Sequence, residues 1–149
     1  MLPPGVGAAR WRDPVAVGNC LGVDHSAISV ASLAESVAFY EALGLTVSGR
    51  SLNRGPEQDR LDGLASSGVD IVALETPDPA SPHIELLAYP HPVRSPAPTA
   101  PNDLAATRLE FQVASLPAMV ERLRACGASF VSPGLIADPD GHLLVFSEG

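Results

Sequence analysis

Histidine and glutamate side chains that could transfer protons lie on segments with strand-like patterns. His83 and Glu85 are two residues apart in one apolar segment, and His25 opens an earlier one. Residues two apart on a strand point to the same face, so His83 and Glu85 would share a face. Imidazole and carboxylate groups exchange protons near neutral pH and also bind divalent cations. The sequence therefore indicates a polar site built on strands.

A third strand-like segment carries an obligate cation. By the same alternation, Arg108, Glu110 and Gln112 would share one face. Arginine is always protonated and cannot donate a lone pair to a metal, but it binds anions well. Arg108 would either stabilise a substrate oxyanion or neutralise Glu85 or Glu110, and in both cases we expect a carboxylate partner. Glu110 is then either a general base or that ion-pair partner.

The composition excludes several classes of function. All nine basic residues are arginines, and the absence of lysine rules out Schiff-base catalysis and a Walker-type phosphate lysine. The net charge of -8, with scattered arginines, argues against a nucleic-acid partner. No apolar run reaches the roughly 20 residues that span a bilayer. Two cysteines and no signal-peptide pattern predict a reduced, cytoplasmic protein without a membrane partner.

An internal repeat predicts the elements that position these side chains. Ser32 and Gly44 of the first copy correspond to Ser115 and Gly127 of the second, at the same offset. Serine is a favourable helix N-cap, and glycine commonly ends a helix. Apolar residues recur at helical spacing between each serine and glycine, so each copy is predicted to contain a strand, a capped amphipathic helix and further strands.

Strand patterns follow each predicted helix. The predicted strands cover residues 45–51, 69–75 and 84–89 in the first copy, and 129–132, 135–137 and 143–147 in the second. Residues 52–68 are expected to form a polar loop. The sequence DPDG at residues 138–141 is a strong turn signal between the last two strands.

Other chemically notable residues are assigned structural roles. Phe39 and Tyr40 are expected to lie in the core, and Cys126 is expected to be a small buried residue in a helical last turn. His142 follows the DPDG turn and is expected to be exposed. His91 lies between two prolines in a predicted linker.

The motifs, in this order, resemble the vicinal oxygen chelate superfamily, which includes glyoxalase I, methylmalonyl-CoA epimerase, extradiol dioxygenases and bleomycin-resistance proteins. The segments that carry the resemblance are Asp24-His25, Phe39-Tyr40 with the LGL sequence at 43–45, HIELL at 83–87 and DPDGH at 138–142. The resemblance covers residues 22–147 and is specific to a fold rather than to a reaction.

The resemblance implies an α+β fold in which two βαβββ modules form a curled mixed sheet around a cavity. Residues 1–21 would form an irregular N-terminal arm, and residues 22–149 a single domain. Within that domain we expect module one at 22–90, a proline-rich linker at 91–104 and module two at 105–149. Many members of the superfamily are homodimers, so a homodimer is expected here.

The resemblance also implies a degenerate metal site. Metal-dependent members place one ligand on the first and one on the fourth strand of each module. These positions fall on His25 and Glu85 in module one, and on Arg108 and Val145 in module two. Neither arginine nor valine can bind a metal. No cofactor is therefore expected, unless Glu110 joins His25 and Glu85 as a third ligand of a divalent cation.

The function expected from these residues is that of a small-molecule enzyme of the lyase or isomerase type. Glu85 or Glu110 would remove a proton next to a carbonyl, His25 would act as acid–base partner, and Arg108 would stabilise the oxyanion. The further residues expected to line the cavity and contact substrate are Ser29, His83, Gln112 and Val145.

Two alternatives have the same fold. One is a non-catalytic binding protein that resembles the bleomycin-resistance branch, for which the acidic net charge would suit cationic ligands. The other is a metal-dependent glyoxalase or dioxygenase with substituted ligands. All three interpretations involve a small molecule as the partner.

Overall fold

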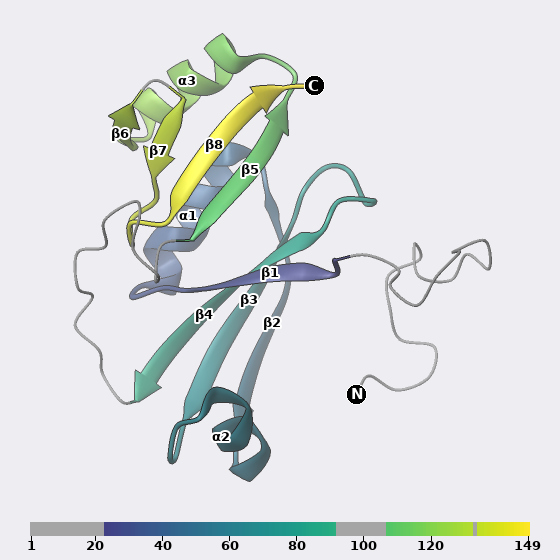
Figure 1. Cartoon of the computed structure of the whole chain (residues 1–149), viewed down its shortest axis with the longest axis vertical. Helices are drawn as coiled ribbons and strands as arrows, with labels where there is room; N and C mark the ends of the chain where they lie inside the picture. Colours follow the sequence, from purple (N-terminus) through teal and green to yellow (C-terminus); the bar gives the residue numbers. More distant parts are fainter. Residues whose placement is uncertain (1–22, 92–106, 133) are drawn as a thin grey trace, which may run out of the picture.

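Two modules, each with a strand, a long helix and three further strands, follow one another along the chain (Figure 1). The computed structural model describes residues 23–91, 107–132 and 134–149. The arm expected at residues 1–21 and most of the linker expected at 91–104 lie outside the described residues. His91, which we assigned to the linker, is instead the last residue of a strand.

Module one contains four strands and two helices. They are β1 (His25–Ser29), α1 (Leu33–Leu43), β2 (Thr46–Arg54), α2 (Pro56–Asp62), β3 (Gly68–Glu75) and β4 (His83–His91). The strand order in the sheet is β1-β4-β3-β2, in which β1 and β4 are parallel and the other pairs are antiparallel. Helix α2 replaces part of the expected polar loop. It is only seven residues long and has no buried residue, so it lacks the apolar stripe that would have predicted it.

Module two has the same βαβββ order without a counterpart of α2, and its last three strands are shorter than those of module one. Its elements are β5 (Arg108–Val113), α3 (Leu116–Ala125), β6 (Ser129–Ser132), β7 (Leu135–Ala137) and β8 (Leu143–Glu148). The strand order is β5-β8-β7-β6, again with the first pair parallel. The predicted α+β class with two βαβββ modules is confirmed, and the two sheets are separate four-stranded sheets. Within the described residues, no helix is both long and apolar enough to cross a bilayer.

Both long helices begin at the serines that the repeat predicted. The Ser32 hydroxyl accepts a hydrogen bond from the Glu35 amide at 3.3 Å, and the Ser115 hydroxyl accepts one from the Ala118 amide at 3.4 Å. Each bond satisfies an amide that has no partner within the helix. Gly44 ends α1 in the left-handed region, with φ of 105°.

Replacing either capping serine with alanine should lower the free energy of unfolding by about 1 kcal/mol. The reason is the loss of one hydrogen-bond acceptor at the first turn of the helix. Urea denaturation followed by circular dichroism would measure the change. Ser51→Ala, at an exposed position of β2, is the control and should change stability by less than about 0.5 kcal/mol. Equal effects at all three positions would contradict a capping role.

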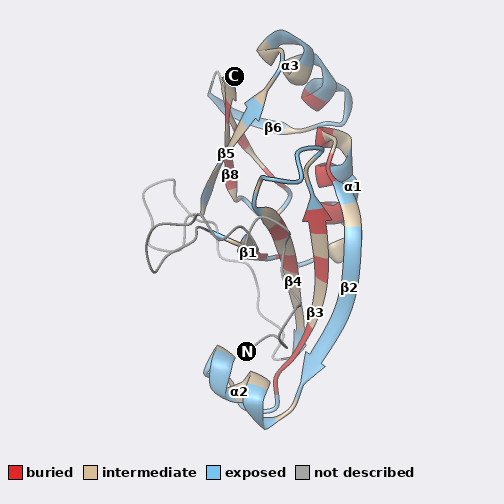
Figure 2. Cartoon of the chain, turned by 90° about the vertical axis from the view of Figure 1, so that its right-hand side faces the viewer, coloured by how far each residue is buried: buried red, intermediate tan, exposed pale blue. Residues whose placement is uncertain are grey.

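The two modules share one apolar core, which lies between the sheets and helices α1 and α3 (Figure 2). Phe39 and Tyr40 are buried on α1, as predicted. The strands and α3 contribute buried side chains from both modules, among them Ile28, Val72, Leu74, Ile84, Leu86, Leu123, Leu144 and Phe146. The prediction that Cys126 is buried is wrong, because Leu123 occupies the inward position of the last turn of α3 and Cys126 is exposed.

The turn at residues 138–142 joins module two to the start of α1 (Figure 1). The Asp140 carboxylate accepts hydrogen bonds from the Ala31 amide at 2.8 Å and the Ser36 hydroxyl at 3.1 Å. His142 Nε2 lies 2.8 Å from the Ser29 carbonyl oxygen. Because a carbonyl only accepts, His142 must donate this bond from Nε2. His142 is therefore half-buried between the modules, and the expectation that it is exposed is wrong.

Asp138 is the buried centre of this turn. Its side chain accepts hydrogen bonds from the Tyr40 hydroxyl at 3.0 Å and from the amides of Asp140 and His142 at 3.0 and 2.8 Å. Burial raises the pKa of the Asp138 carboxyl above its ordinary value, against the lowering effects of electrostatic attraction to His142 and of these hydrogen bonds. Burial, and the neighbouring Asp138 charge, also raise the pKa of Tyr40. The modules are thus fixed to each other through a fully hydrogen-bonded polar contact.

Candidate functional site

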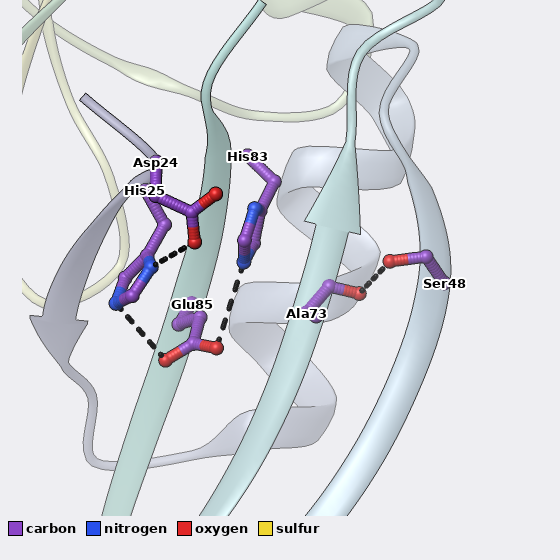
Figure 3. A network of polar contacts seen from close by, with 6 residues as sticks. All are labelled: Asp24, His25, Ser48, Ala73, His83 and Glu85. Atoms are coloured by element: carbon purple, nitrogen blue, oxygen red, sulfur yellow. Dashed lines mark hydrogen bonds and ion pairs between the residues drawn. The ribbon is translucent and has the colours of Figure 1, made fainter. Parts of the chain in front are cut away.

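The candidate site lies on the face of the first sheet that does not contact α1. In the parallel pair of β1 and β4, His25 lies opposite His83, and Ala27 lies opposite Glu85. These positions alternate with the buried residues of the same strands, so the side chains of His25, His83 and Glu85 point away from the core. Figure 3 shows the side chains of His25, His83 and Glu85 in front of the strands, with α1 behind them.

Glu85 lies between the two imidazole rings. One carboxylate oxygen, Oε2, is 3.6 Å from His25 Nε2, and the other, Oε1, is 3.5 Å from His83 Nε2. The ring centroids of His25 and His83 are 5.0 Å apart. The N···O distances exceed those of strong hydrogen bonds, so Glu85 adjoins both rings without being tightly bonded to either. The Glu85 and His83 side chains each retain 25% of their exposure, so the cluster is accessible.

Asp24 completes the cluster from the residue just before β1. Its Oδ2 atom is 3.0 Å from His25 Nδ1. A carboxylate can only accept, so this hydrogen bond places a proton on Nδ1 of His25. Asp24 was not among the predicted site residues, although the Asp24-His25 pair was noted as a motif. The alternation rule missed it because Asp24 lies outside the strand.

The predicted residues of module two lie on a different sheet. Arg108, Glu110 and Gln112 occupy the exposed positions of β5, as alternation predicted. Glu110 lies opposite Val145 on β8 and accepts a hydrogen bond from the Ser147 hydroxyl at 3.0 Å. Ser147 is therefore the hydrogen-bond partner of Glu110 on the exposed face of the second sheet.

Among the described residues, the expected ion pair of Arg108 with Glu85 or Glu110 is not formed. In the described ranges, Arg108 makes no ion pair with Glu85 or Glu110, and no hydrogen bond or ion pair joins β5 to the His25–Glu85 group. Arg108 is exposed at the start of β5, so its charge is solvated and needs no carboxylate partner. The repeat correctly gives Arg108 and His25 equivalent positions within their modules, but equivalence does not bring them into contact.

The remaining predicted contacts are dispersed. Ser29 lies at the end of β1 on the same exposed face as His25, and its backbone carbonyl oxygen accepts a hydrogen bond from His142. Gln112 lines an open, mostly apolar groove of about 370 Å³ between the end of α1 and β5. This groove contains neither His25 nor Glu85, so it is separate from the polar cluster.

The fold and the position of the cluster define a class: proteins built from consecutive βαβββ modules with polar residues on the first and fourth strands. The chain belongs to the glyoxalase/bleomycin resistance protein/dioxygenase superfamily, whose family model matches residues 22–146. This confirms the resemblance found in the sequence. Among curated protein sequences, no significant match is found.

Solved structures agree with this assignment. A glyoxalase family protein from Bacillus cereus is 30% identical, with a TM-score of 0.77 over 89% of this chain and 97% of that chain. A glyoxalase/bleomycin resistance protein/dioxygenase domain from Frankia sp. EAN1pec is 21% identical, with a TM-score of 0.63 over 86% and 97% of the two chains. The trypanothione-dependent glyoxalase I of Leishmania major is 19% identical, with a TM-score of 0.60 over 85% and 86%. The last two show a shared fold.

A metal site with one ligand from each of four strands in two modules does not fit these residues. The two module-two positions hold Arg108, a fixed cation, and Val145, which has no donor atom. Module one, by contrast, gathers two imidazoles and two carboxylates. Donor atoms of Asp24, His25 and His83 lie within 4.8 Å of one another, and Glu85 adjoins both rings.

Proposed function

We propose that this protein is a small-molecule enzyme of the lyase or isomerase type, with its proton-transfer centre in module one. One observation supports the proposal above all others: each oxygen of the Glu85 carboxylate faces an imidazole nitrogen on an accessible strand face. A carboxylate and two imidazoles can accept, hold and return a proton in the pH range of most metabolism.

In the proposed reaction, Glu85 acts as the general base. It removes a proton from a carbon next to a substrate carbonyl, and the electron pair of the broken C–H bond moves toward the carbonyl oxygen. A protonated imidazole of His25 or His83 donates a hydrogen bond to that oxygen and stabilises its charge. The proton held on Glu85 then returns to a carbon or leaves with a departing group, which completes an isomerisation or an elimination.

Asp24 and His25 have different roles in the proposed reaction. The hydrogen bond from His25 Nδ1 to Asp24 fixes the orientation of the imidazole ring, as a carboxylate does for a catalytic histidine. His25 Nε2 then remains directed toward Glu85 and a bound substrate. Arg108 is not part of this centre, since it lies on β5 without a described contact to the cluster. Glu110 is a less suitable base, because a serine hydroxyl is its described partner.

Solvent exchange tests this proposal across several classes of carbonyl compound. The purified protein in D₂O would be mixed with 2-oxo acids, 2-hydroxy ketones and acyl thioesters, and ¹H NMR would follow the protons next to each carbonyl. We expect at least one class to exchange faster with the protein than in buffer, and the double variant His25→Gln/His83→Gln to lose this acceleration. Exchange at the buffer rate across all classes would refute proton transfer as the function.

A further inference from the structure

We propose that Asp24, His25 and His83 form a divalent-cation site within module one alone. The inference deepens the proposed function, and it rests on that function only for the role of the cation in binding substrate. The site differs from the pattern inherited from the superfamily in two of its ligands, Asp24 and His83, and in needing nothing from module two.

Donor atoms of three side chains converge on the exposed face of β1 and β4. One donor atom each from Asp24, His25 and His83 can be chosen so that all three lie within 4.8 Å of one another. Metal–ligand bonds of about 2.0–2.2 Å place neighbouring ligands about 3.0–3.5 Å apart, so small side-chain rotations would bring these atoms around one ion. Figure 3 shows the Asp24 carboxylate at one edge of the two rings and Glu85 at the other.

The groups around the two imidazoles are also arranged as at a metal site. A histidine that binds a metal through one nitrogen usually donates its other N–H to a carboxylate, which fixes the tautomer. Glu85 is placed for this task at both rings, 3.6 Å from His25 Nε2 and 3.5 Å from His83 Nε2. His25 Nδ1 is then the atom directed toward Asp24, at 3.0 Å. A cation that displaces the proton of this hydrogen bond would gain two ligands at once.

The donor set also indicates the kind of cation. Two imidazoles and one carboxylate suit zinc, cobalt, nickel or ferrous iron, whereas magnesium and calcium prefer oxygen ligands. The Asp24 and His25 side chains retain 43% and 40% of their exposure, which leaves coordination positions open to a ligand. A divalent cation held there would supply Lewis acidity to an oxygen of the bound molecule.

A cobalt titration tests the site directly. Protein without an affinity tag would be freed of metal with a chelator and titrated with Co²⁺, with visible absorption as the readout and calorimetry with Zn²⁺ in parallel. We expect about one ion per chain. Asp24→Ala and His83→Ala should weaken binding at least about 100-fold, since loss of a ligand exceeds the about 10- to 100-fold cost of an outer partner. Glu85→Gln should weaken it only about 10-fold.

Controls and contrary outcomes separate this inference from the proposed function. Arg108→Gln and Glu110→Gln are matched exposed substitutions on β5, and both should bind Co²⁺ as the wild type does. Circular dichroism would show that the Asp24 and His83 variants remain folded. Failure of the wild type to bind either ion, or undiminished binding by Asp24→Ala, would overturn the cation site. Proton exchange by the chelator-treated protein would leave the proposed function standing even then.

Discussion

Glu85→Gln is expected to lower the rate of proton exchange by about 10²- to 10⁴-fold, the usual contribution of a general base. Glutamine keeps the shape of the side chain and one acceptor oxygen near the imidazoles, but it cannot take up a proton. Substrate binding should change much less than the catalytic rate. The measurement is kcat and KM for exchange of the substrate class identified by NMR, for wild type and variant side by side.

Glu110→Gln is the matched control for this prediction. Glu110 is exposed on β5, and its described partner is Ser147 rather than a histidine. Its substitution should leave kcat within about threefold of the wild type, as expected for a residue outside the reacting group. A large loss for Glu110→Gln with normal exchange by Glu85→Gln would move the base to module two.

Asp138→Ala is expected to lower the free energy of unfolding by about 2–3 kcal/mol. The substitution leaves the Tyr40 hydroxyl and the amides of Asp140 and His142 without their acceptor in the interior. An unsatisfied buried donor costs more than the hydrogen bond itself contributed. Urea denaturation would measure the loss. Asp138→Asn keeps an acceptor oxygen and should cost about 1 kcal/mol; equal losses for the two variants would contradict the hydrogen-bond account.

A comparison of the wild type with Asp138→Asn also gives a prediction for the pH dependence of stability. Because burial raises the pKa of Asp138 above its ordinary value of 3.8, the folded state binds this proton more tightly than the unfolded state. Its contribution to stability is then fully present below pH 3.8 and is lost as the pH rises through the raised pKa. The stability of the wild type relative to Asp138→Asn should therefore decline with increasing pH over this window. A relative stability that increases with pH would contradict this and show that His142 and the hydrogen bonds outweigh burial.

The strongly periodic elements were predictable from the sequence because their signals are local. Helix α1 begins after Ser32 and ends before Gly44, as capping chemistry and apolar spacing predicted. Helix α2 was not predictable, since its only local signals are Pro56 at the start and Gly63 at the end. Both residues are equally typical of loops.

The candidate site was predictable where strand geometry alone determines it. Alternation correctly gave His83 and Glu85 one face, and the parallel pairing adds His25 opposite His83. The contact of His142 with Ser29 spans 113 residues along the chain and depends on how the modules dock. No local pattern encodes such a contact. The position of Arg108 relative to Glu85, with no ion pair between them, depends in the same way on how the modules dock.

Binding of the small molecule at the module-one cluster is the central claim, and imidazole NMR tests it most directly. The side-chain ¹⁵N resonances of His25, His83 and His142 would be assigned with single His→Gln variants and followed during titration with the compound identified by proton exchange. We predict shifts at His25 and His83, with His142 unchanged because it is held between the modules. Titration that leaves both His25 and His83 unmoved while the compound binds would contradict the claim.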